Sequence, residues 1–68
     1  MKEIVINTDT IKLDAFLKWA GIVNMGSEAK IYIQEGKIKL NGNIETQRGK
    51  KLIKGDIIEF QDESYKII

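Results

Sequence analysis

The sequence contains no cysteine, no histidine and no proline among its 68 residues. Without cysteine, no disulfide can stabilise the fold and no thiolate can bind a metal. Without histidine, acid–base catalysis near neutral pH would need a tuned pair of carboxyl groups. The acidic residues are scattered, and we interpret the one adjacent pair, Asp62–Glu63, as a solvated turn. We therefore expect a protein that is not an enzyme and has no cofactor or metal.

Long apolar runs are also missing. The apolar residues, 43% of the chain, come in short interrupted stretches, whereas a membrane-spanning helix needs roughly 20 in succession. An alternating pattern follows directly after Met1–Lys2–Glu3, so we expect no signal peptide. A chain of this length forms one domain at most, and we assign residues 1–68 to it. The lack of cysteine suits a reducing compartment, and we expect a cytoplasmic monomer.

The formal net charge of +1 conceals an uneven distribution of charge. Residues 1–29 hold three basic and four acidic side chains, and residues 55–68 hold one basic and four acidic. Residues 30–54 hold seven basic and two acidic side chains, a net charge of +5. A polyanion would be attracted by this middle segment rather than by the average charge.

Two amphipathic helices are predicted in the first half of the chain. The first has an apolar stripe with helical spacing: Leu13, Phe16, Leu17 and Ala20. We expect Asp9–Thr10 to cap its start and Gly21 to end it. The second begins at Gly26–Ser27, with Ser27 as its expected cap. Its stripe comprises Ala29, Tyr32, Ile33 and Gly36.

The other segments follow the two-residue period of strands. Ile4 and Ile6 indicate a short first strand, residues 37–41 a second, and residues 57–60 and 65–68 the last two. Asn41–Gly42 predicts a hairpin turn, and residues 46–51 read as a polar loop. A strand, two helices and a run of strands indicate an α+β domain with two helices packed on a small antiparallel sheet.

The basic side chains of the middle segment are candidates for a binding site. Lys37 and Lys39 share one face of a predicted strand, and Lys30 lies on the helix before it. Three more surround Gly49 in the polar loop: Arg48, Lys50 and Lys51. Glycine lets the backbone approach a phosphate, and arginine can donate two hydrogen bonds to it. From spacing alone, polyanion binding and an ordinary solvated surface remain about equally open.

Three apolar or aromatic side chains have more than one interpretation. Trp19 borders the stripe of the first helix, so it either lies at the edge of the core or forms a platform on which a base stacks beside Lys12. Tyr32 is predicted to lie in the core. Ile31 points away from the stripe of its helix and is either an isolated exposed residue or a contact for a partner.

An ordered set of segments resembles the S-four RNA-binding domain, which is named for a small-subunit ribosomal protein. The segments span residues 11 to 60: Lys12–Leu17, Gly21–Ile22, Ala29, Gly36–Gly42 and Gly55–Ile58. The chain looks most like the short stand-alone bacterial members of YaaA or YbcJ type. Those have a glycine-rich start of the second helix and an Arg–Gly–basic–basic–Leu segment, matched here by Met25–Lys30 and Arg48–Leu52.

This resemblance implies a fold of two helices against a small, bent antiparallel sheet, with RNA bound along the helix pair and the adjacent strand and loop. Lys12 takes the place of the usual arginine before Leu–Asp. Many members have Ser–Arg where this chain has Met25–Gly26, which shifts the expected contacts towards the second helix and the loop. The candidate RNA-binding residues are Lys12, Lys30, Lys37, Lys39, Asn41, Arg48, Gly49, Lys50 and Lys51.

We therefore expect a non-catalytic protein that binds structured RNA, either ribosomal or transfer RNA, free or on a ribosomal subunit. Binding would use phosphate and shape contacts rather than base sequence, with no small-molecule substrate. The alternative is a protein–protein interaction module that uses Ile31, Trp19 or a sheet edge. A sulfur carrier would need a terminal Gly–Gly where this sequence has Ile67–Ile68.

Overall fold

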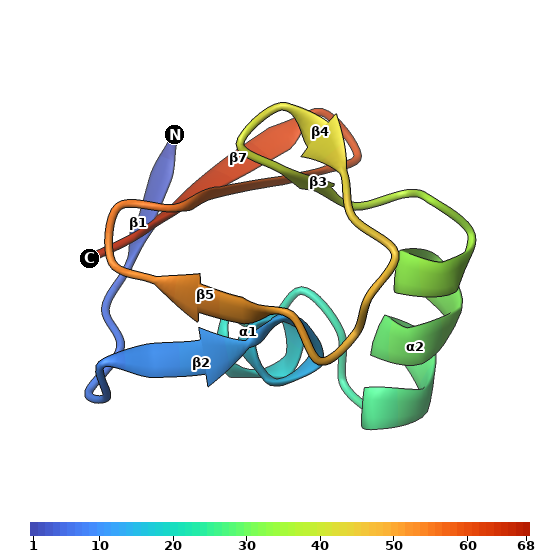
Figure 1. Ribbon diagram of the computed structural model, residues 1–68, viewed down its shortest axis with the longest axis horizontal. Helices are drawn as coiled ribbons and strands as arrows, with labels where there is room; N and C mark the ends of the chain where they lie inside the picture. Colours follow the sequence, from blue (N-terminus) through green and yellow to red (C-terminus); the bar gives the residue numbers. More distant parts are fainter.

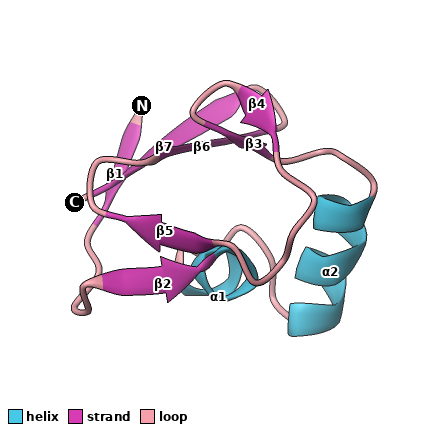
Figure 2. Ribbon diagram, viewed as in Figure 1, coloured by secondary structure: helices cyan, strands magenta, loops and turns pink.

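Two β-sheets and two helices make up the computed structural model, which describes residues 1–68 (Figure 1). The elements in chain order are β1 (Lys2–Ile4), β2 (Thr10–Lys12), α1 (Leu13–Trp19), α2 (Gly26–Gln34), β3 (Lys39–Leu40), β4 (Asn43–Ile44), β5 (Lys51–Ile53), β6 (Ile57–Phe60) and β7 (Glu63–Ile67). Figure 2 shows α1 beside the two-stranded sheet of β2 and β5, with α2 at one end of the molecule.

The larger sheet has five strands in the order β1-β7-β6-β3-β4. The pairs β7–β6, β6–β3 and β3–β4 are antiparallel, whereas β1 runs parallel to β7. The predicted class, α+β with two helices and a small sheet, is confirmed. The sheet is mixed rather than wholly antiparallel, because the first strand lies beside the last one in the same direction. A two-residue period does not report the direction of pairing.

The segment before the first helix is a strand and not a helix cap, so the prediction for Asp9–Thr10 was wrong. Thr10–Lys12 forms β2 and pairs antiparallel with β5, with Ile11 opposite Leu52. Lys12 occupies the N-cap position of α1 without a side-chain hydrogen bond. Backbone carbonyls of a distant loop accept the first N–H groups of the helix instead, so no capping side chain is needed.

Most residues of the predicted helical stripes are buried, while Ala20, Tyr32 and Gly36 are only partly buried. In α1, the buried residues are Leu13, Phe16 and Leu17, and Gly21, with φ +74°, follows the end of the helix. The second helix begins at Gly26, so Ser27 is not its cap. The Glu28 carboxylate instead accepts a hydrogen bond from the Asn24 backbone N–H at 3.1 Å.

Two tight hairpins connect strands of the larger sheet. Asn41 and Gly42 have φ of 51° and 88°, which confirms the predicted Asn–Gly turn, since both central residues of this turn need positive φ. Gln61 and Asp62, with φ of 50° and 65°, form the same kind of turn between β6 and β7. Because this turn needs only two residues, β7 begins at Glu63, earlier than predicted.

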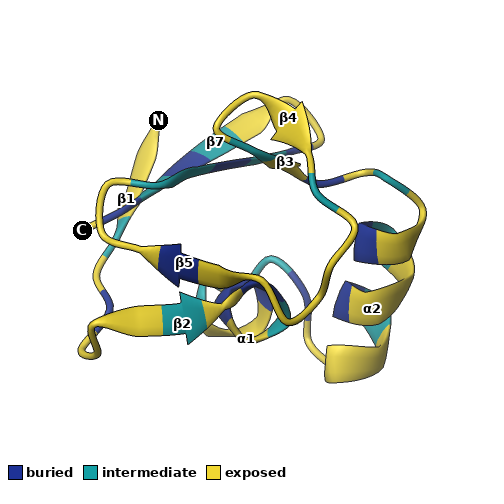
Figure 3. Ribbon diagram, viewed as in Figure 1, coloured by how far each residue is buried: buried dark blue, intermediate teal, exposed yellow.

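A single apolar core lies between the sheets and helices (Figure 3). It contains 13 buried residues, none of them polar: Ile6, Leu13, Phe16, Leu17, Val23, Ala29, Ile33, Ile38, Leu52, Ile58, Phe60, Tyr65 and Ile67. Tyr32 packs at the edge of this core against the Phe60 ring, with 4.9 Å between centroids. Trp19 and Ile31 lie outside the core. Neither helix is long and apolar enough to cross a membrane.

Candidate nucleic-acid interface

The loop that precedes β5 is held against the start of α1 by the backbone. The Leu13 N–H donates to the Lys50 carbonyl at 2.9 Å, and the Asp14 N–H donates to the Arg48 carbonyl at 3.1 Å. The loop is also closed on itself, because the Lys50 N–H donates to the Gln47 carbonyl at 3.1 Å. The backbone of this loop is therefore fixed, while its basic side chains remain exposed.

Pairing of β2 with β5 brings a further lysine to this loop. Lys12 lies directly opposite Lys51 in the antiparallel register, so the two side chains share the outward face of the small sheet. Both are exposed, and neither makes an ion pair. Like charges in this position are unfavourable unless an anion lies between them. We call the four exposed cations Lys12, Arg48, Lys50 and Lys51 the basic cluster.

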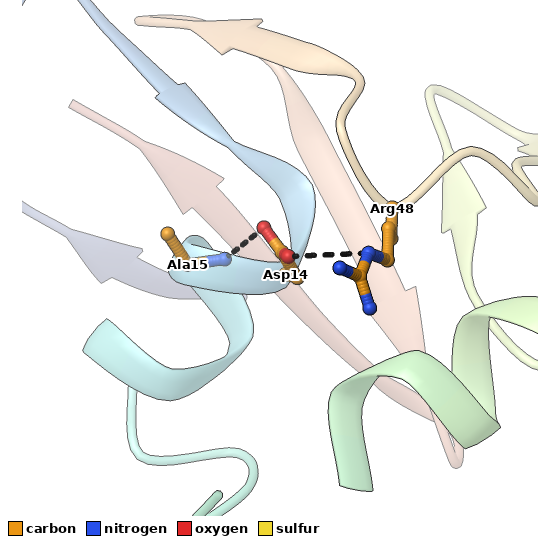
Figure 4. A network of polar contacts seen from close by, with 3 residues as sticks. All are labelled: Asp14, Ala15 and Arg48. Carbon is orange, nitrogen blue, oxygen red and sulfur yellow. Dashed lines mark hydrogen bonds and ion pairs between the residues drawn. The ribbon is translucent and has the colours of Figure 1, made fainter. Parts of the chain in front are cut away.

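Arg48 lies beside an acidic side chain of α1 (Figure 4). One carboxylate oxygen of Asp14 accepts a hydrogen bond from the Ala15 N–H at 2.8 Å. The other lies 4.0 Å from Nε of Arg48, a distance at the limit of an ion pair. The Arg48 side chain is 54% exposed, and its terminal amino groups have no partner within the chain. They are the groups with which arginine binds phosphate oxygens.

Lys37 and Lys39 belong to a different surface from the basic cluster. Lys37 forms an ion pair with Glu35 at 3.2 Å, and Lys39 lies opposite Glu59 in the sheet. Both lysines line a shallow hollow that also contains the acidic Glu59 and Asp62. They lie on one surface, although β3 begins only at Lys39 and Lys37 precedes the strand. Carboxylates of this chain partly neutralise that surface.

The remaining predicted residues lie in three different settings. Lys30 is exposed on α2, without an ion pair. Asn41 is exposed, but its amide is occupied: Nδ2 donates to Asp56 at 3.1 Å and Oδ1 accepts from the Ile57 N–H at 2.9 Å. Gly49 has no positive φ and no close neighbour, so the loop conformation does not require glycine there.

Lys18 was missed by the sequence analysis. It lies in the segment of residues 1–29, whose net charge is negative, so averaging over that segment hid it. In the structure it lines two shallow hollows, one with Asp14, Ala15 and Gly26 and one with Ile11, Ala15 and Trp19. Its position in the last turn of α1, four residues after Asp14, could have suggested a place on the same helix face as Asp14.

The functional groups of the site are the exposed cations of the basic cluster. No group of three or more acidic, histidine or cysteine side chains is placed to hold a metal ion. No buried side-chain polar atom lacks a hydrogen-bond partner. Such an arrangement can attract and hold anions, with backbone hydrogen bonds and a β-ladder to keep the cations in place.

Two bacterial proteins are similar in sequence to most of this chain. A protein of Bacillus subtilis (strain 168) named "Probable ribosome maturation protein RlbA" is 36% identical over 58 residues, which are 85% of this chain and 82% of the relative. A protein of Escherichia coli (strain K12) named "Putative RNA-binding protein YbcJ" is 33% identical over 58 residues, which are 85% of this chain and 83% of the relative.

Solved structures and a family profile agree with these relatives. The solution structure of E. coli YbcJ, described as revealing an alpha-L motif involved in RNA binding, matches all of this chain and 87% of its own, with a TM-score of 0.75 and 29% identity. The 30S ribosomal protein S4e of Thermoplasma acidophilum shares the fold, with a TM-score of 0.66 over 88% of this chain and 32% of its own, at 20% identity. The profile of the S4 domain matches residues 4–68. The resemblance noted in the sequence is thus confirmed, and the chain belongs to the S4 domain family.

Proposed function

We propose that this protein is a non-catalytic RNA-binding protein that recognises structured RNA through its basic cluster. The observation that carries the proposal is the β2–β5 pairing, which places Lys12 directly opposite Lys51 beside the anchored loop of Arg48 and Lys50. The cations are exposed and, apart from the distant contact of Arg48 with Asp14, lack carboxylate partners. A phosphate group between them would relieve their repulsion.

Recognition in this proposal depends on phosphates and on the shape of the RNA. The bases of double-helical RNA are hidden in a deep, narrow groove, so a small basic surface senses the geometry of the backbone. Each phosphate that is neutralised releases condensed counterions, so affinity falls as salt is raised. With four cations engaged, the slope of log K against log salt should be about −3 to −4.

The other predicted residues would have smaller roles. Lys30 would contribute from α2, and Gly49 would let a phosphate approach the loop of the basic cluster. Lys37 and Lys39 would contact RNA only where it reaches their separate surface, while Asn41 supports the fold. Ribosomal RNA is the target class that the name of RlbA supports, with transfer RNA as the other folded candidate. A ribosomal subunit in the cytoplasm would present such RNA to a monomer of this protein.

The test is binding to ribosomal subunits and to total structured RNA over a series of salt concentrations. The variant Lys50→Glu/Lys51→Glu should lose at least about tenfold in affinity at low salt. Its salt slope should be shallower by about 1.5 to 2, because each lost phosphate contact removes nearly one unit.

The matched control is Lys2→Glu/Lys54→Glu, which makes the same change in net charge at two exposed lysines outside the basic cluster. It should keep the wild-type slope and most of the affinity. An equal loss in both variants would show a general effect of net charge, and binding that did not depend on salt would refute the phosphate mechanism.

A further inference from the structure

Trp19 is an exposed aromatic side chain whose orientation is set by a hydrogen bond. Its side chain is 56% exposed, in the last turn of α1. The indole Nε1–H donates to the Val5 carbonyl at 2.8 Å. This bond uses the only polar group of the ring and ties one edge of it to the segment that follows β1. The exposed part of the ring is therefore apolar, aromatic and held in place.

The ring borders a groove that leads to the basic cluster. Trp19, Ile11, Ala15 and Lys18 line a shallow groove on the outer side of α1. The neighbouring hollow is lined by Asp14, Ala15, Lys18 and Gly26. Because Ala15 and Lys18 line both, the two hollows adjoin across the helix. Together they extend from Trp19 to Asp14, where Arg48 lies (Figure 4).

We propose that this groove is a stacking site for an unpaired RNA base next to the phosphates held by the basic cluster. The proposal rests on the proposed function and adds to it a preference for RNA with an unpaired nucleotide beside a helix. Trp19 would supply the π-face, and Lys18, between the ring and the cluster, would neutralise the phosphate of the stacked nucleotide. Stacking on an aromatic ring tolerates any base.

The geometry of α1 defines the path of such a strand. A helix rises 1.5 Å and turns about 100° per residue, so Trp19 lies about 7.5 Å along the axis from Asp14 and about 140° around it. The hollows that share Ala15 and Lys18 connect these two sides of the helix. A strand with one phosphate at Arg48 would follow these hollows around α1 to place an unpaired base at Trp19. The cation at Lys18 favours an RNA strand over an uncharged protein segment as the occupant.

Trp19 is the only tryptophan of the chain, so its fluorescence reports directly on this groove. The probe is an RNA hairpin with a short single-stranded adenosine extension, compared with the same hairpin whose extension is abasic. Binding of the base-bearing hairpin should quench the fluorescence strongly, and the abasic hairpin should not. Affinity for the base-bearing hairpin should be about tenfold higher than for the abasic one. This ratio corresponds to the lower part of the range for stacking one base on an aromatic ring.

Two variants distinguish the contribution of the aromatic ring to binding from that of the hydrogen bond to Val5. Trp19→Leu and Trp19→Phe both lose the bond to Val5, but only phenylalanine keeps an aromatic face. Trp19→Leu should bind the two hairpins equally, at the wild-type affinity for the abasic one, while Trp19→Phe should keep most of the preference. Ile31→Ala is the control, since Ile31 is 53% exposed but on α2; it should behave as wild type. Circular dichroism checks that each variant is folded.

The results distinguish this proposal from the one on which it rests. Salt-dependent binding of both hairpins with equal affinity and without quenching would overturn the stacking site and leave phosphate binding intact. Failure to bind either hairpin or other structured RNA would overturn both. Quenching by ribosomal proteins freed of RNA, but not by the base-bearing hairpin, would assign the groove to a protein partner and also overturn the proposal.

Discussion

The side-chain amide of Asn41 joins the β3–β4 hairpin to the turn that connects β5 of the small sheet with β6 of the larger one. It donates to Asp56 and accepts from the Ile57 N–H, and Asp56 in turn accepts from the Ile53 N–H at 2.9 Å. Asn41 also adopts a positive φ of 51°, which asparagine tolerates better than most residues. A residue that the sequence placed among the RNA contacts thus holds the turn after β5 to the β3–β4 hairpin.

Replacing Asn41 by alanine should destabilise the protein by about 1 to 3 kcal/mol, because the Ile57 N–H and the Asp56 carboxylate each lose a partner. Urea unfolding measures the change. Asn43→Ala is the matched control: its side chain is exposed and makes no hydrogen bond, so its effect should stay within about 0.5 kcal/mol. An equally small effect at Asn41 would show that its amide bonds contribute little to stability.

At the level of secondary-structure elements, the small sheet combines a structural and a binding role. Its inner face contributes Leu52 to the core, and its outer face presents Lys12 opposite Lys51. Pairing two lysines in register is unfavourable in the absence of an anion. In the proposed function, RNA phosphate offsets the repulsion between the two lysines in the complex.

The change Lys51→Glu should therefore stabilise the free protein while weakening RNA binding. It replaces a repulsive cross-strand pair by an attractive one, with an expected gain of about 0.5 kcal/mol in the free energy of unfolding. Thermal unfolding at low salt gives the measurement, and raising the salt should reduce the gain. Lys50→Glu, outside the strand register, should change stability less. A loss of stability at Lys51→Glu would contradict the repulsion between the lysines.

On the scale of the whole molecule, both sheets share one core. Leu52 from the two-stranded sheet is fully buried together with Ile58 and Ile67 of the five-stranded one. A domain of this length is stabilised by only roughly 3 to 10 kcal/mol. The two sheets should therefore unfold together, although no strand of one is paired with a strand of the other.

Leu52→Ala should cost about 2 to 5 kcal/mol and lower the melting temperature of the whole molecule in a single transition. Far-ultraviolet circular dichroism and Trp19 fluorescence should give the same midpoint, because Trp19 is on α1 beside the small sheet. Ile53→Ala changes an adjacent residue that is 54% exposed and should cost much less. Separate midpoints for the two signals would mean that the small sheet unfolds independently.

Local features of the sequence sufficed to predict both helices and the β3–β4 hairpin. The stripes of Leu13, Phe16 and Leu17 and of Ala29 and Ile33 mark the buried faces, because helical periodicity reflects which side of an element meets the core. Asn41–Gly42 predicts its turn because these residues tolerate positive φ. The excess of positive charge in residues 30–54 and the segments shared with the S-four domain likewise needed no coordinates.

The tertiary structure decided which of those charges lie together. Lys12 joins Arg48, Lys50 and Lys51 through hydrogen bonds and a β-ladder between segments far apart in the chain, whereas Lys37 and Lys39 lie among carboxylates on another surface. The pairing with β5 made Thr10–Lys12 a strand, and a separate pairing set β1 parallel to β7. The packing of α1 left Trp19 exposed, with its N–H bonded to the Val5 carbonyl. Periodicity identifies an apolar face, but the choice of partner for that face depends on how the whole chain packs.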